Sequence, residues 1–371
     1  MTELRINKSF LDFAGSMPET RLVDDETAAD LELDEVFKGI DRTLTTPGQS
    51  MLYALMRSTP TEEAVFSHRI ERIRFYEDRP DLRNTLRKLL KKKVGRQLVD
   101  AAARELYAFS DFGFSKYRPL ISIWIAATLV SCVTPVFLGV WAVFMIVLPI
   151  ALLNIVIYGK TTGQISVHTP SLYYIGVMAS FCGRIKKLRG FEESEELAAL
   201  TSLYPKIKRV IGPASFLKPV NSFGGDMSDA FLILIKVFFL GELSNYLKAV
   251  AAIRDSGKEL RSLYETVGTL DAFCSLAAAA DEESAPVSAR VIKGFGKIEA
   301  TAALHPLVDD CVPVSFSFDR GVILTGTNMS GKSTFLRTLG LNQILATNFG
   351  FAYADSFETD LYFVSSSIRS E

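Results

Sequence analysis

The residues best suited to chemistry lie in "GTNMSGKS", residues 326–333, which fits the pattern G-x-x-x-x-G-K-[ST]. Glycines at positions 326 and 331 allow a close backbone approach that a Cβ would block. The amides of such a loop can cradle phosphate oxygens, and the Lys332 amine can reach the β- and γ-phosphates. The Ser333 hydroxyl can ligate Mg²⁺, which prefers oxygen ligands. The pattern predicts a binding site for ATP with Mg²⁺.

The segments on both sides of this loop are suited to positioning it. "GVILTG" before it is expected to be a buried strand, and "STFLRTLGLNQILAT" after it is expected to be an amphipathic helix that starts near Lys332. A strand, a glycine-bounded loop and a helix are the order that a phosphate loop requires. The positive N-terminal end of the helix would add to the attraction for phosphate.

Hydrolysis needs a second acidic residue that holds Mg²⁺, normally after a later hydrophobic strand. The downstream candidates Asp355, Glu358 and Asp360 do not follow a run of four apolar residues, and Ser365 follows the one such run, "LYFV". We therefore expect the acidic strand to lie beyond Glu371, which leaves the catalytic residue unknown. An ATPase activity is expected for the full-length protein, and this chain alone is expected to be inactive.

The rest of the chain is predicted to be mainly helical. Leu33, Val36, Phe37 and Ile40 recur at helical spacing, and similar periodicity continues to the polar stretch "DEESAPVSA". Short β-prone runs such as "VPVSFSF" follow. The expected fold class is α + α/β, with the first part of a phosphate-loop ATPase domain at the C-terminal end. The predicted domains are an irregular segment 1–30, a helical lever or core domain 31–118 and 160–285, a hairpin 119–159 and the ATPase part 286–371.

The hairpin is predicted because no charged residue occurs from Pro119 to Gly159. This length is about twice the ~20 residues that one membrane-spanning helix needs, and Gly139 offers a turn near the middle. Basic residues on both flanks, Arg118 and Lys160, predict two spans of the inner (plasma) membrane with both termini in the cytoplasm. Two alternatives stay open: a pair of buried core helices in a soluble protein, and a re-entrant hairpin.

The bulk composition excludes few classes of protein. The 41 basic and 42 acidic residues nearly cancel, so overall charge does not indicate a nucleic-acid binder. The four cysteines and three histidines are scattered, which argues against a zinc site. Dense basic runs occur only at 87–96 and 184–190. They suit a lipid surface or a solvated helix, with contact to nucleic-acid phosphates as the alternative.

"TGTNMSGKSTFLRTLGLNQILA" resembles the phosphate loop of the MutS family of DNA mismatch-repair ATPases, in which T-G-x-N-M-x-G-K-S-T is characteristic. "LHPLVDD", residues 304–310, resembles the segment that opens the ATPase domain of the family, and residues 33–60 resemble the start of its helical lever. The resemblance implies an ABC-type ATPase fold. It implies that the nucleotide is held by Gly326, Thr327, Asn328, Met329, Ser330, Gly331, Lys332, Ser333 and Thr334, with His305 and Pro306 close by. For His305 and Pro306 a turn that seats the first strand is an equal alternative.

The sequence also departs from the family pattern. Thr327 and Ser330 stand where mismatch-repair members usually have Pro and Gly, no mismatch-reading domain precedes the lever, and the hairpin has no counterpart in the soluble repair proteins. The chain is in these respects similar to short, membrane-associated MutS-related proteins. The resemblance implies a homodimer through the ATPase domain, with membrane lipid as a partner and duplex DNA as a further one. The alternatives are an ABC-type transporter subunit and a scaffold that senses nucleotide without hydrolysis.

Overall fold

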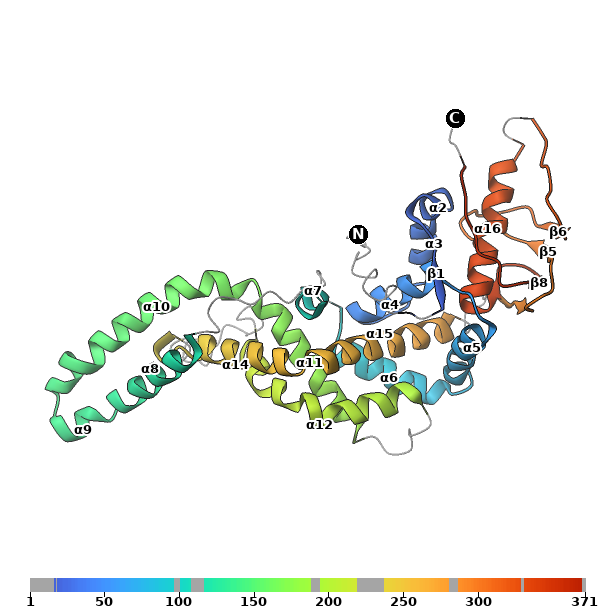
Figure 1. The fold of residues 1–371 in the computed structure, drawn as a ribbon. Coiled ribbons are helices and arrows are strands. Elements are labelled where there is room, and N and C mark those ends of the chain that lie inside the picture. Colours follow the sequence, from blue (N-terminus) through green and yellow to red (C-terminus); the bar gives the residue numbers. More distant parts are fainter. Residues whose placement is uncertain are drawn as a thin grey trace. The chain divides into compact units, whose positions relative to one another are not determined.

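A computed structural model describes residues 17, 19–96, 101–107, 117–187, 194–218, 237–279, 286–327 and 330–368. The chain divides into two compact units, one formed by residues 1–97 and 267–371 and the other by residues 98–266. Most of the described residues are helical, and small mixed sheets lie toward the C-terminal end (Figure 1). The expected mainly helical chain with an α+β ending is confirmed at this level.

The first unit combines N-terminal helices with the C-terminal strands. Its helices are α2 (Asp25–Asp30), α3 (Leu33–Ile40), α4 (Thr46–Arg57), α5 (Glu63–Glu77), α6 (Pro80–Lys93), the second half of α15 (Gly257–Ala279) and α16 (Lys332–Phe349). Its strands are β1 (Thr20–Leu22), β2 (Ser58–Pro60), β3 (Val287–Ser288), β4 (Arg290–Val291), β5 (Ile298–Ala303), β6 (Val314–Phe318), β7 (Phe351–Ala352) and β8 (Ser356–Thr359).

The largest sheet of this unit has the strand order β4-β8-β5-β6, in which only β4 and β8 run parallel. Helix α16 lies alongside it (Figure 1). Small side chains let the helix approach closely, because Ala300 and Ala303 of β5 and Ala346 of α16 are buried together around Phe357. The predicted strand in "VPVSFSF" is confirmed as β6.

The predicted strand in "GVILTG" is wrong. Residues 321–327 adopt no regular structure, and the side chains of Val322 and Ile323 are 56% and 90% exposed. A strand forms only when its N–H and C=O groups pair with a neighbouring strand. No strand pairing among the described residues includes this segment, so its apolar pattern alone does not produce a strand.

Helix α4 shows how the helical part of this unit is held. Pro47 lies in the first turn, a position that suits proline, and the Thr45 hydroxyl accepts from the Gly48 N–H. The buried carboxylate of Asp271, in α15, then accepts from the Leu44 and Thr45 amides and from the Thr45 hydroxyl. A carboxylate from a distant segment therefore holds the start of α4.

The second unit is helical throughout its described residues. Its elements are α7 (Ala101–Tyr107), α8 (Arg118–Ser131), α9 (Thr134–Leu138), the π-helical turn η2 (Val143–Val147), α10 (Leu148–Ser166), α11 (Thr169–Ile185), α12 (Glu195–Phe216), α14 (Gly241–Asp255) and the first half of α15. Helices α11 and α12 pack closely, because a Cβ at Gly176 would lie 2.4 Å from the Ala214 Cβ.

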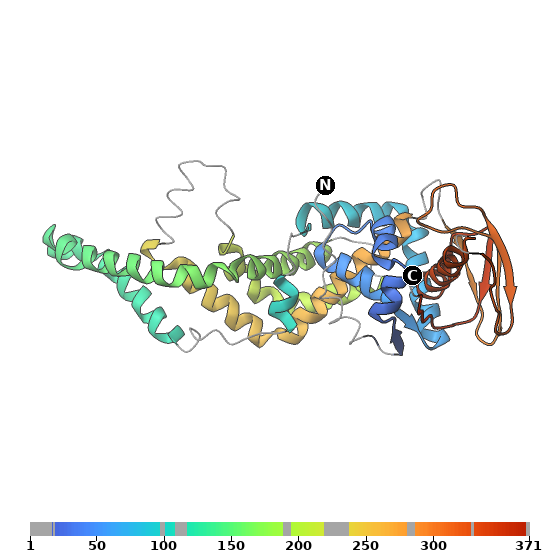
Figure 2. The ribbon, with the colours of Figure 1, turned by 90° about the horizontal axis from the view of Figure 1, so that it is seen from above.

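The expected hairpin is present as α8 and α9 on one arm and η2 and α10 on the other. The arms meet near Gly139, which has a positive φ of 75° (Figures 1 and 2). Two stretches, Arg118–Leu138 of 21 residues and Val143–Ser166 of 24 residues, are long and apolar enough to cross a membrane. Only 11% and 6% of the most apolar 18 residues in these stretches are buried, whereas the core helices of a soluble protein are mostly buried.

Candidate functional site: a phosphate loop at the start of helix α16

The glycine-bounded loop leads directly into α16. Gly331 is the residue before the helix and has a positive φ of 85°, which favours glycine. At Gly326 a Cβ would lie 2.7 Å from the Ser330 hydroxyl oxygen, so a side chain there would fill the loop. The backbone at both glycine positions of the pattern therefore favours glycine over a residue with a side chain. Asn328 and Met329 lie outside the described residues.

The Lys332 side chain folds back across the loop. Its ammonium donates to the carbonyl oxygens of Gly326, at 2.8 Å, and Thr327, at 2.6 Å. The Ser330 N–H donates to the Thr327 carbonyl in a turn. The start of the loop is thus tied to Lys332, the first residue of the helix, and the positive charge lies at the exposed opening. The oxygens of a triphosphate placed there would replace the two neutral carbonyls as acceptors of the Lys332 ammonium. This exchange is favourable because hydrogen bonds between two charged groups are stronger than those to a neutral acceptor.

The first turn of α16 is open to a ligand. Ser333 and Thr334 are exposed, and no side chain caps the N-terminal amides of the helix. Uncapped helix N–H groups carry partial positive charge and are suited to anions. The loop and this turn therefore fit the phosphates of ATP, with the Ser333 hydroxyl as an oxygen ligand that would hold the accompanying Mg²⁺.

His305 and Pro306 form a turn after β5, with the Val308 N–H donating to the His305 carbonyl. The His305 ring nitrogen Nδ1 accepts from the Leu307 N–H at 3.2 Å. Burial is the main cause that lowers the pKa of His305 below its usual value. Among the described residues, the structure gives no hydrogen bond between this histidine and the loop. The position of His305 beside a nucleotide therefore stays a prediction.

Two of the three downstream carboxylates, Asp360 and Glu358, make contacts within the sheet region. Asp360 accepts from the amides of Gly296 and Leu361, and Glu358 pairs with Arg290 on the neighbouring strand. These contacts hold the sheet and its turns.

The other end of α16 is anchored by residues that the sequence did not single out. The Asn348 side-chain amide donates to the Met56 carbonyl at 2.7 Å. The buried guanidinium of Arg69 donates to the carbonyls of Ser58 and Asn348, at 3.1 and 3.3 Å. Burial lowers the pKa of Arg69 to about 10. No sequence pattern predicts these contacts, since they join segments far apart in the chain.

Asp30, at the end of α2, is a second residue that sequence reasoning missed. Its carboxylate accepts from the Ser366 hydroxyl and the Ile368 N–H, at 2.9 and 2.7 Å, while its carbonyl accepts from the Arg337 guanidinium in α16. The N-terminal helix α2 is thereby tied both to the phosphate-loop helix and to the extended segment that follows β8.

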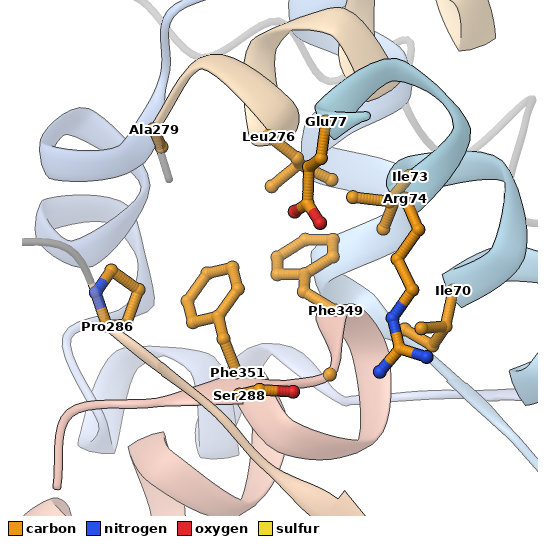
Figure 3. A pocket seen from close by; sticks show the side chains of 11 residues that line it. Ile70, Ile73, Arg74, Glu77, Leu276, Ala279, Pro286, Ser288, Phe349 and Phe351 are labelled. Carbon is orange, nitrogen blue, oxygen red and sulfur yellow. The ribbon is translucent and has the colours of Figure 1, made fainter. Parts of the chain in front are cut away.

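A cavity of about 160 Å³ adjoins the anchored end of α16 (Figure 3). Phe349 and Phe351 stack at a centroid distance of 5.8 Å on one side of it, and Arg74 and Glu77 supply its charged groups. Small-molecule sites usually measure about 300–1,000 Å³, so this cavity is too small for a nucleotide. It also adjoins the end of α16 opposite to the loop, so we do not assign it to the phosphate site.

Comparisons with known proteins find partial likeness. No model of a known protein family matches the chain. The chain is 32% identical over 123 residues to the DNA mismatch repair protein MutS of Halothermothrix orenii, which covers 31% of this chain and 14% of that protein. It is 31% identical over 128 residues to MutS of Streptococcus agalactiae, covering 33% of this chain and 15% of the relative.

A mitochondrial mutS homolog of Sarcophyton glaucum is 40% identical over 77 residues, or 19% of this chain and 8% of that protein. The chain therefore spans about a seventh or less of the length of these curated relatives. It is distantly related in part to MutS proteins.

Proposed function

We propose that this chain belongs to a MutS-related ATP-binding protein in which nucleotide binding pairs two copies and moves the helical region. The observation that carries the proposal is the open phosphate loop, with Lys332 across its mouth and uncapped helix amides behind it. The partial similarity to MutS proteins supports the same reading. ATP would be held at the loop, and Mg²⁺ would neutralise phosphate charge beside Ser333.

Calorimetric titration of ATP and Mg²⁺ into the full-length protein tests this proposal. Lys332→Ala should weaken ATP affinity by about tenfold or more, because it removes a charge-assisted contact to the phosphates. Lys297→Ala is the matched control, since Lys297 is a partly exposed lysine of the same unit that pairs with Glu299. Equal affinity of the Lys332→Ala variant and the unaltered protein would refute the assigned role.

The route from the loop to the helical region runs through α16. This helix begins at the loop and ends at carbonyls and side chains of α4 and α5, while Arg337 contacts Asp30 of α2. A displacement of the loop on nucleotide binding would reach the N-terminal helices through these contacts. ATP-dependent pairing, measured as mass by light scattering, should be absent in the Lys332→Ala variant.

The hairpin is proposed to anchor the protein in a lipid bilayer. Large apolar side chains at its tip are exposed, with Phe137 at 81% and Trp141 at 72%. Soluble monomers rarely expose a contiguous apolar surface of this extent. Both arms have about the length that crosses a ~30 Å hydrocarbon core, which favours full spans over a re-entrant loop. The protein should fractionate with membranes and require detergent; a monodisperse preparation without detergent would contradict the anchor.

DNA is a second candidate partner, supported by a basic surface on α11 and α12. Lys186 lies over the Tyr204 ring at 5.9 Å, and exposed Lys206, Lys208 and Arg209 follow on α12. Duplex DNA should bind with an affinity that falls steeply with salt.

The remaining alternatives differ in measurable ways. A transporter subunit would need several spans, whereas two helical stretches in the described residues meet the length and composition of a span. A nucleotide-sensing scaffold would bind ATP without turnover, so phosphate release by the full-length protein, with and without duplex DNA, separates it from an ATPase.

A further inference from the structure

One polar side chain in the hairpin contrasts with its apolar surroundings. Asn154, in α10, is fully buried, although most of its neighbours along the helix are exposed. Its Oδ1 accepts from the Trp124 indole N–H of α8 at 2.7 Å. Its amide donates to the Thr128 hydroxyl at 3.3 Å and to the Phe238 carbonyl at 2.6 Å. Every polar atom of this side chain therefore has a partner, the condition for an amide to lie inside a bilayer.

The third partner comes from outside the hairpin. Phe238 belongs to the apolar stretch "VFFL", residues 237–240, which precedes α14. A second contact follows four residues later on both segments, where the Tyr158 hydroxyl donates to the Glu242 carboxylate at 3.2 Å. The equal spacing of the two contacts shows that residues 238–242 run beside α10 in the same direction.

These contacts indicate how deep the contacting residues would lie in the bilayer. Asn154 lies six residues before Lys160, and Trp124 lies six residues after Arg118, the charged residues at the two ends of the hairpin. At a rise of about 1.5 Å per residue, both residues lie ~9 Å from the level of these charged residues, inside the layer that the uncharged part of the hairpin spans. This layer is called the charge-free layer below. The Phe238 carbonyl must lie at the same depth, whereas Glu242, beside Tyr158, lies near the charged boundary. The segment thus leaves the layer as it enters α14.

We propose that residues 237–240 form a third lipid-embedded element, held against the hairpin by Asn154 and in contact with acyl chains of the bilayer. This inference rests on the proposed insertion of the hairpin. Val237, Phe238 and Phe239 carry no charge and are half-buried, so part of each side chain is available to lipid. The Asn154 amide donates to the Phe238 carbonyl, and a partner of this kind is what a backbone carbonyl requires in hydrocarbon.

Depth-dependent quenching tests the proposal on the full-length protein in phosphatidylcholine vesicles that contain acyl-brominated lipid. Cys132, Cys182, Cys274 and Cys311 are replaced by Ala in the background for labelling. A fluorophore is then attached to Phe239→Cys, to Leu153→Cys on the exposed side of the hairpin, or to Lys248→Cys on the exposed side of α14. The proposal expects quenching at position 239 as strong as at 153, and several-fold stronger than at 248.

The outcomes separate this inference from the anchor itself. Quenching at 153 without quenching at 239 would overturn the third element and leave the hairpin in the bilayer. Absence of quenching at both positions would overturn the hairpin proposal, and this inference with it.

The role of Asn154 is tested separately. Asn154→Leu should reduce quenching at 239 without a change at 153. Ser166→Ala is the matched control, because the exposed Ser166 hydroxyl donates to the Gly163 carbonyl of its own helix. Unchanged quenching at 239 in Asn154→Leu would refute the role of Asn154.

Discussion

The two ends of helix α16 are built differently. At its start Ser333 and Thr334 are exposed, and no side chain caps the amides. From Gly340 to Phe349 every residue is buried. The open end carries the groups that suit phosphate, and the closed end carries the packing and hydrogen bonds that hold the helix in its unit.

The difference indicates that the groups suited to binding a ligand and the groups that stabilise the fold lie at opposite ends of α16. Uncapped amides and an exposed lysine contribute little to stability, but they remain available to a ligand. Buried contacts from Arg69 and Asn348 hold the far end without contacting the loop. Substitutions at the closed end should therefore change the free energy of unfolding, while those at the open end should change nucleotide affinity.

The largest effect is expected for Arg69→Ala. It removes a buried side chain and leaves the carbonyls of Ser58 and Asn348 without this donor. A loss of about 2–4 kcal/mol in the free energy of unfolding follows from the cavity and the unpaired groups. Urea titration measures it. Arg74→Ala, an exposed arginine of the same helix, is the control and should lose under ~0.5 kcal/mol. Equal losses in the two variants would break the comparison.

A pH dependence is expected from Asp271, which holds the start of α4. Burial, partly offset by hydrogen bonds from Thr45 and Leu44, raises the pKa of this carboxyl from 3.8 to about 6. The folded state therefore keeps a proton that the unfolded state releases. The stabilisation is complete below pH 3.8 and is lost as pH rises through about 6. Its size is about 2–3 kcal/mol.

Urea titrations between pH 4 and 7 measure this loss of stability. Asp271→Asn should abolish the decrease, whereas Asp81→Asn, at an exposed carboxylate, should retain it. A decrease of the same size in Asp271→Asn would assign the titration to another group.

A smaller effect is expected for Asn348→Ala. The substitution removes the hydrogen bond to the Met56 carbonyl, but the Asn348 Oδ1 is buried without a partner among the described residues. Because the lost donor is partly balanced by relief of that unsatisfied oxygen, we expect a loss of about 1 kcal/mol. ATP affinity should stay unchanged in the same calorimetric titration. A fall in affinity comparable to that of Lys332→Ala would show that the two ends are not separate.

The smallest effect is expected at the open end, for Ile323→Ser. The Ile323 side chain is 90% exposed, so the change should alter the free energy of unfolding by under ~0.5 kcal/mol. Ile344→Ser, at a fully buried position of α16, is the matched control and should cost several kcal/mol. A large loss in Ile323→Ser, measured by urea titration, would mean that this segment packs against a neighbour in solution.

Local patterns were sufficient where the physics is local. A helix pairs its own backbone groups, so α3, α4, α16 and both arms of the hairpin could be predicted from periodicity, proline and glycine positions. The phosphate pattern was readable for the same reason, because its glycines, lysine and serine lie within eight consecutive residues. The exposure of the hairpin did not prevent its helices from forming.

Tertiary structure decided what depends on distant partners. The segment 322–325 has the apolar pattern of a strand but no neighbour to pair with, so it stays irregular. The contacts of Asn348 with Met56 and of Asp271 with Thr45 join residues separated by 292 and 226 positions, and no local pattern encodes them. The sequence by itself indicated which segment is suited to binding phosphate and which is suited to contact with lipid. Only the folded chain determined which buried polar groups hold those surfaces, because hydrogen bonds over such separations exist only after the segments have packed.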